Sequence, residues 1–107
     1  MRILLDHCLP RRLARAFPSH TVRTTAEQGW NRLRNGKLLA AASSAFDLFL
    51  TIDKNLKHEQ NMATLPLAVM VVMARSNRLD DVLPFVPIIE EELARLRPQT
   101  FVEVFLR

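Results

Sequence analysis

Short apolar runs that alternate with helical patterns constrain this chain most strongly. Residues 67–73 are apolar without interruption, as in a strand that is buried on both faces of a parallel sheet. Further strands are predicted at residues 2–5, 20–24, 47–52 and 100–106. Helical spacing of apolar side chains separates most of these runs. The pattern predicts an α/β domain with a mostly parallel central sheet of four to five strands, and it leaves the direction of the last strand open.

The segments between the strands carry helix signals of different strength. Pro10 precedes apolar side chains at helical spacing, and residues 37–46 place theirs on one helical face. Residues 25–28 predict one helical turn closed by Gly29. Residues 54–64 predict irregular helical turns. Ser76 and Asn77 indicate the start of a helix that Pro84 interrupts.

Length and composition predict one packed domain over residues 1–107. Of the 107 residues, 49% are hydrophobic and 24% charged, which favours a buried core over disorder. The single cysteine, Cys8, excludes an internal disulfide and is typical of a reducing compartment. No apolar run approaches the roughly 20 residues of a membrane helix, and the first apolar run is too short for a signal peptide. We therefore expect a cytoplasmic protein without a membrane partner.

Two of the predicted strands end in an aspartate. Asp6 follows Leu4 and Leu5, and Asp53 follows Thr51 and Ile52. In an open α/β sheet, ligands bind outside the carboxyl ends of the strands where the strand order reverses. An order such as 2-1-3-4 makes the first and third strands neighbours, about 4.8 Å apart. Asp6 and Asp53 are therefore predicted to converge on a site for Mg²⁺ or Mn²⁺, ions that prefer oxygen ligands. In the alternative interpretation, each aspartate caps the segment that follows it.

Seven stretches of the chain carry its most characteristic residues: Leu4-Leu5-Asp6, Leu9-Pro10-Arg11-Arg12-Leu13, Asn35-Gly36-Lys37-Leu38-Leu39, Phe46-Asp47, Thr51-Ile52-Asp53-Lys54-Asn55-Leu56, Gln60-Asn61 and Ser76-Asn77-Arg78-Leu79. Together they resemble the DUF5615 group of PIN-like proteins, in order and spacing, over nearly the whole chain. The resemblance implies a three-layer α/β/α PIN-like domain and a metal-dependent endoribonuclease, often the toxin of a toxin–antitoxin pair. It also implies a homodimer, and it matches Asp6 and Asp53 to catalytic, metal-binding acids.

Other positions depart from the PIN-like pattern. Members often carry Asp-Glu after the first strand, where this chain has Asp6-His7, and an acid near the start of the middle helix, where it has Asn35. Glu27 and Glu59 are the candidates for a missing carboxylate. The short acidic set favours an alternative function, a noncatalytic module of the same fold that binds RNA or a protein partner.

Basic residues gather in the first third of the chain, and the net charge is +4. This asymmetry indicates either a nucleic-acid-binding surface or a solvated basic face. If RNA binds, Arg11, Arg12 and Lys54 are predicted to position phosphates. Asn55 is expected to line the crevice or to satisfy its own loop, and Arg75 to reach the same sheet edge.

Three further side chains have a functional and a structural interpretation. His7 is a metal ligand or an exposed loop residue, and Trp30 is a stacking platform or a packing anchor. Cys8 lacks a paired base in the sequence, so we do not expect a nucleophile there.

Overall fold

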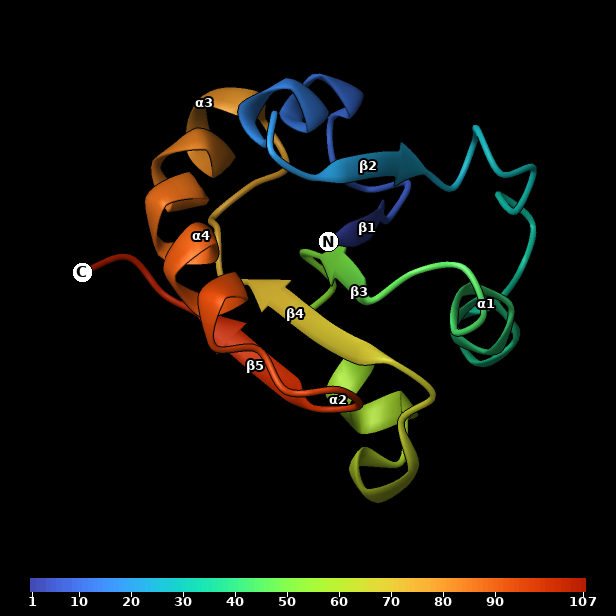
Figure 1. The fold of residues 1–107 in the computed structure, drawn as a ribbon. Coiled ribbons are helices and arrows are strands. Elements are labelled where there is room, and N and C mark those ends of the chain that lie inside the picture. The colour runs from blue at the N-terminus through green and yellow to red at the C-terminus, as the bar shows by residue number, and fades with distance from the viewer.

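Five parallel strands form one sheet in the computed structural model, which describes all residues 1–107 (Figure 1). The sheet order is β2-β1-β3-β4-β5. The strands are β1 (Arg2–Leu5), β2 (Thr21–Thr24), β3 (Leu48–Thr51), β4 (Ala68–Val72) and β5 (Phe101–Val104). The α/β class and the reversal between β1 and β3 are confirmed. The direction of the last strand is settled as well, because β5 pairs in parallel with β4.

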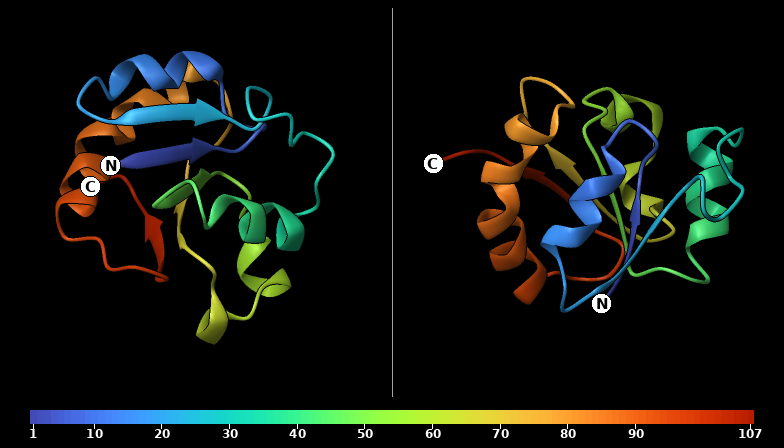
Figure 2. Two further views of the ribbon diagram at one scale, coloured as in Figure 1. Left: turned by 45° about the vertical axis from the view of Figure 1, so that its right-hand side comes forward. Right: turned by 90° about the horizontal axis from the view of Figure 1, so that it is seen from above.

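Helices cover both faces of this sheet. The connections carry α1 (Asn35–Ala42), α2 (Leu56–Glu59), α3 (Leu79–Val82) and α4 (Val86–Ala94), and three short 3₁₀ helices, η1 (Arg11–Ala16), η2 (Met62–Thr64) and η3 (Leu83–Phe85). Figure 2 shows η1, α3 and α4 on one side of the strands and α1 on the other. The molecule therefore has three layers, α/β/α.

Two apolar clusters separate the layers, one on each face. Alternate residues of β1 divide between them: Ile3 and Leu5 join the cluster under η1, α3 and α4, whereas Leu4 joins the one under α1 and α2. β4 is buried along its whole length, as its uninterrupted apolar sequence predicts. Because each face of the strands packs against its own cluster, the register of the strands is fixed as well. A slip of one residue would move every side chain to the opposite face.

Local structure differs from the sequence-based expectation at three points. The segment after Pro10 is a 3₁₀ helix rather than an α-helix, although Leu13 is fully buried as predicted. The helix expected at residues 37–46 begins at Asn35 and ends at Ala42. Asn77 does not cap α3, because Arg78 occupies the cap position without a side-chain hydrogen bond. No helix of the chain has the length and apolar character needed to cross a membrane.

Candidate functional site

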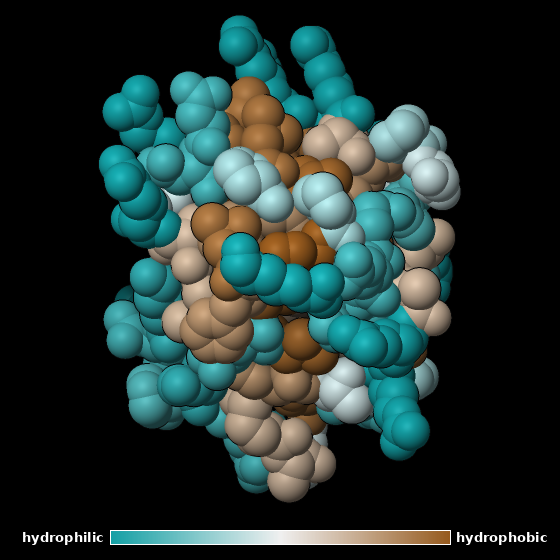
Figure 3. Space-filling model, turned by 90° about the vertical axis from the view of Figure 1, so that its left-hand side faces the viewer, coloured by the Kyte–Doolittle hydropathy of each residue, from teal (hydrophilic) through white to brown (hydrophobic).

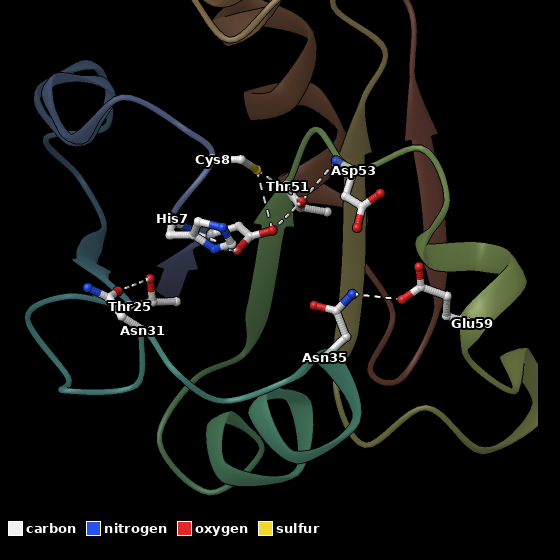
Figure 4. A network of polar contacts seen from close by, with 9 residues as sticks. His7, Cys8, Thr25, Asn31, Asn35, Thr51, Asp53 and Glu59 are labelled. Carbon is white, nitrogen blue, oxygen red and sulfur yellow. Dashed lines mark hydrogen bonds and ion pairs between the residues drawn. The ribbon is translucent and has the colours of Figure 1, made fainter.

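Asp6 and Asp53 lie at the same edge of the sheet, joined through Thr51 (Figure 4). The backbone N–H of Asp6 continues the ladder by donating to the Leu50 carbonyl at 2.9 Å, which places Asp6 beside the end of β3. The buried Thr51 hydroxyl donates to Asp6 Oδ2 at 2.7 Å and accepts from the Asp53 N–H at 3.0 Å. The predicted adjacency of the two strand ends is therefore present in the structure.

The Asp6 carboxylate is buried and surrounded by donors. Only 4% of the residue is exposed. Oδ1 accepts from the backbone N–H of His7 at 2.8 Å and lies 2.9 Å from His7 Nδ1, while Oδ2 accepts from Thr51 and from Cys8 Sγ at 3.4 Å. The network holds a negative charge at a fixed position, with the exposed imidazole of His7 at its outer rim.

Cys8 contributes to this network as a thiol. Burial raises the pKa of Cys8 above its ordinary value, and the neighbouring Asp6 charge acts in the same direction. The protonated Sγ can donate to Asp6, whereas a thiolate beside that carboxylate would be repelled. Since the thiolate is the nucleophilic form of cysteine, the structure agrees with the expectation that Cys8 is not a nucleophile.

Asp53 points to a different side of the sheet edge. Its Oδ1 accepts a hydrogen bond at 3.0 Å from the backbone N–H of Asn55, two residues further along the chain. This bond closes a local turn and does not cap α2, whose N-cap residue is Asn55. In Figure 4 the Asp53 carboxylate points away from His7 and Cys8. It lies on the side where Asn35 donates to Glu59 at 3.1 Å. Glu59 thus reaches the start of α1.

The side chains at this edge offer few ligands for a metal ion. No three His, Cys, Asp or Glu side chains of the chain are grouped so that they could hold a metal ion, and both oxygens of Asp6 already accept bonds from the protein. Two carboxylates suit Mg²⁺ only where substrate phosphates complete the coordination shell. The Mg²⁺ or Mn²⁺ site at Asp6 and Asp53 stays a prediction.

A groove of about 640 Å³ opens beside Asp6, between η1 and the segment that follows β2. We call it the Asp6 groove. Its lining residues are Asp6, His7, Leu9, Arg11, Arg12, Ala14, Arg15, Thr24, Thr25, Ala26, Glu27 and Asn31. Another groove, of about 620 Å³, lies at the opposite edge near Phe46 and Leu67. We place the functional site at the Asp6 groove because it combines a buried charge, free cations and hydrogen-bonding side chains.

Arginine side chains form one wall of the Asp6 groove. Arg11, Arg12 and Arg15 belong to η1 and are exposed, and none of them takes part in an ion pair. Leu13, which follows Arg12 in the sequence, is fully buried and holds the 3₁₀ helix against the sheet. An anchored turn therefore presents three unneutralised guanidinium groups, which suit phosphate oxygens.

The opposite wall is the turn at residues 24–31, and it is polar with one acid. Thr24 and Glu27 bond reciprocally: the Thr24 N–H donates to Glu27 Oε1 at 2.9 Å, and the Glu27 N–H donates to Thr24 Oγ1 at 3.1 Å. The Thr25 hydroxyl, in a residue 1% exposed, donates to Asn31 Oδ1 at 3.1 Å. Gly29, at φ 71°, closes the predicted helical turn.

The structure brings together only part of the residues predicted for nucleic-acid binding. Arg11 and Arg12 share the Asp6 groove, whereas Lys54 and Asn55 follow β3 and do not line it. Arg75 lies beyond the end of β4 in a separate hollow, with its Nε 3.6 Å from Asp81 Oδ1. Trp30 packs edge-on against Phe46, with ring centroids 6.1 Å apart, as a packing anchor would.

Sequence reasoning missed four residues of this site: Arg15, Thr25, Asn31 and Thr51. Two signals point to Thr25 and Arg15 in retrospect, and none points to Asn31 or Thr51. Thr24-Thr25-Ala26-Glu27 is a capping-box pattern directly after a strand, and Arg15 continues the basic face of Arg11 and Arg12 by one turn.

Comparison of the chain with protein-family models, with curated proteins and with solved structures gave no match. The fold and the site therefore rest on the molecule itself. They define an α/β protein with an all-parallel sheet and a basic groove at the carboxyl ends of its strands.

Proposed function

We propose that this protein binds RNA through the Asp6 groove, as a PIN-like module. The observation that carries the proposal is the η1 wall, where three exposed arginines, none of them in an ion pair, line the Asp6 groove. Arginines placed in this way bind phosphates by bidentate, charge-assisted hydrogen bonds. The site lies at the carboxyl ends of β1 and β2, the sheet edge at which open α/β sheets bind their ligands.

The test is binding of a single-stranded oligoribonucleotide across a salt series. Each phosphate contact on a single strand contributes a slope of about −0.7 in log K against log[salt]. Three arginine contacts therefore predict a slope of about −2 in log K against log[salt]. Fluorescence anisotropy between about 50 and 300 mM salt measures it. Binding that is absent, or that does not change with salt, would overturn the proposal.

A second candidate function is metal-dependent hydrolysis of RNA phosphodiesters, possessed by a toxin that an antitoxin holds in check. The observation that favours it is the Thr51 bridge, which fixes the buried Asp6 and the Asp53 backbone at one edge. In this function Asp6 and Asp53 are the metal-binding and catalytic acids, with Glu59 a further carboxylate on the Asp53 side. Homodimerisation and a cytoplasmic location belong to the same proposal.

A cleavage assay separates the two functions. Mixed RNA is incubated with Mg²⁺ or Mn²⁺ and with wild type, Asp6→Asn or Asp53→Asn. Cleavage by wild type alone supports the nuclease. RNA binding by all three proteins at equal background cleavage supports the binding module. Because Asp6 is buried, circular dichroism of Asp6→Asn must first show a folded protein.

A further inference from the structure

We propose that the turn wall of the Asp6 groove, residues 24–31, selects guanine in single-stranded RNA. The inference rests on the proposed RNA binding and adds base selectivity to it. The two walls differ in chemistry: η1 offers only cations, while the turn offers a carboxylate and an amide. Phosphates therefore bind at η1, and the base of the same nucleotide lies against the turn.

The turn wall is held in place before any ligand arrives. The Thr25 N–H donates to the Leu5 carbonyl at 3.2 Å, which extends the pairing of β1 and β2 by one residue. The Trp30 N–H donates back to the Thr25 carbonyl at 2.9 Å and closes the loop. Together with the reciprocal Thr24–Glu27 bonds, these contacts fix the backbone around Glu27 and Asn31, the two side chains that we call the reading side chains because they contact the base. A prearranged site loses little conformational entropy on binding.

Each reading side chain has one end bound and the other free. Glu27 uses Oε1 for the Thr24 N–H, which leaves Oε2 as an acceptor. Asn31 uses Oδ1 for the buried Thr25 hydroxyl, so its Nδ2 is the free end, and Figure 4 shows it directed away from Thr25. The wall thus presents a carboxylate acceptor and an amide donor in fixed orientations.

Guanine matches that pair better than the other RNA bases. Its Watson–Crick edge has two adjacent N–H donors, N1–H and the exocyclic amine, next to the carbonyl O6. A carboxylate can accept both donors, one on Oε2 and the other on the remaining lone pair of Oε1, while an amide N–H₂ donates to O6. Adenine, cytosine and uracil lack two adjacent ring and amine donors on that edge. Reading this edge requires an unpaired base, as in most sequence-specific recognition of RNA.

Stacking does not contribute to the selection. No Phe, Tyr or Trp side chain lines the Asp6 groove, and Trp30 packs against Phe46 instead. The imidazole of His7 is the one aromatic ring at the groove, and a stacking ring tolerates every base because each base has a π-face. Discrimination between bases therefore depends on hydrogen bonds to base edges.

The experiment measures affinities for seven-nucleotide RNAs of adenosine whose central base alone is varied. We expect wild type to bind the guanine-containing RNA about tenfold more tightly than the others, within the range of a bidentate base contact. Glu27→Gln keeps an oxygen for the Thr24 N–H but cannot accept two N–H donors, and Asn31→Asp keeps the Thr25 contact but loses the amide donor. Both variants should reduce the preference to less than about twofold.

Glu91→Gln is the matched control, because it removes the same charge outside the Asp6 groove while retaining an acceptor for Arg107. It should keep the guanine preference. Salt-sensitive binding without any base preference would overturn the guanine proposal and leave the RNA-binding proposal standing. Equal preference in wild type and in a folded Glu27→Gln would also overturn it. Absence of binding to all four RNAs would overturn both proposals.

Discussion

Two faces of this molecule treat their charges in opposite ways. Around η1 and β2, six arginines take part in no ion pair: Arg11, Arg12, Arg15, Arg23, Arg32 and Arg34. Around α4 and β5, two of three arginines are paired with acids, Arg95 with Glu92 at 2.7 Å and Arg107 with Glu91 at 2.5 Å. The unpaired arginines are therefore concentrated between η1 and the start of α1, where a polyanion can use them.

The α4 face is also the more apolar of the two. Figure 3 shows hydrophobic side chains gathered in its middle with hydrophilic ones around them. The chain exposes large apolar side chains nearby at Leu83, Phe105 and Leu106. The comparison shows that the arginines near α4 mostly pair with acids, whereas those of η1 stay unpaired beside a groove.

The largest expected effect concerns how each face is attached to the sheet. Leu13 anchors the arginine-bearing η1 and is fully buried, whereas Leu106 is 55% exposed. Leu13→Ala should lower the free energy of unfolding by about 3 kcal/mol through lost burial and a cavity. Leu106→Ala should change it by less than about 0.5 kcal/mol. Urea denaturation measures both, and equal losses would contradict the assigned packing of η1.

The next effect concerns the free charges themselves. Replacing Arg11, Arg12 and Arg15 together by alanine should weaken RNA binding about 100-fold at 0.1 M salt and reduce the salt slope by about 2. The matched control replaces Arg95, Arg97 and Arg107, which removes the same charge from the α4 side. If both triple variants lose the same affinity, RNA responds to net charge alone and the comparison of the two faces fails.

The sequence predicted the sheet more completely than the site, for a physical reason. Because β4 is buried on both faces, its sequence is a continuous apolar run that predicts a strand. Asp6 and Asp53 are recognisable as site candidates because each follows an apolar run. The groove depends instead on where the turn after β2 folds back toward η1. That contact joins residues such as Arg15 and Asn31, which carry no apolar periodicity, so only three-dimensional placement reveals their common site.

A smaller effect compares two hydroxyls that donate to aspartates of different exposure. Thr51 donates to Asp6, whose side chain is 5% exposed, and Ser76 donates to Asp81, whose side chain is 23% exposed. Thr51→Val should cost about 2 kcal/mol of unfolding free energy, because a buried carboxylate loses a charge-assisted bond. Ser76→Ala should cost less than about 1 kcal/mol, since water replaces the donor. A Thr51→Val variant as stable as wild type would show that Asp6 does not need this bond.

The smallest effect tests what a paired charge contributes to stability. Hydrogen bonds from the Arg2 backbone N–H, at 2.8 Å, and from its guanidinium, at 3.2 Å, lower the pKa of Asp47. A lowered folded-state pKa stabilises the protein above the unfolded value of about 3.9, and this stability is lost as the pH falls through the folded pKa. Both side chains are about half exposed, at 53% and 43%, so Asp47→Asn should cost only about 0.5 kcal/mol at pH 7.

Urea denaturation of wild type and Asp47→Asn at pH 7 and near pH 3 measures this difference. We expect it to shrink at the lower pH, where the wild-type carboxyl group becomes protonated. A difference that stays constant with pH would mean that the bond acts through geometry rather than charge. If exposed pairs contribute this little, the pairs on the α4 face matter mainly because they neutralise its charge. The η1 face, which lacks such pairs, then gives up little stability in exchange for its free arginines.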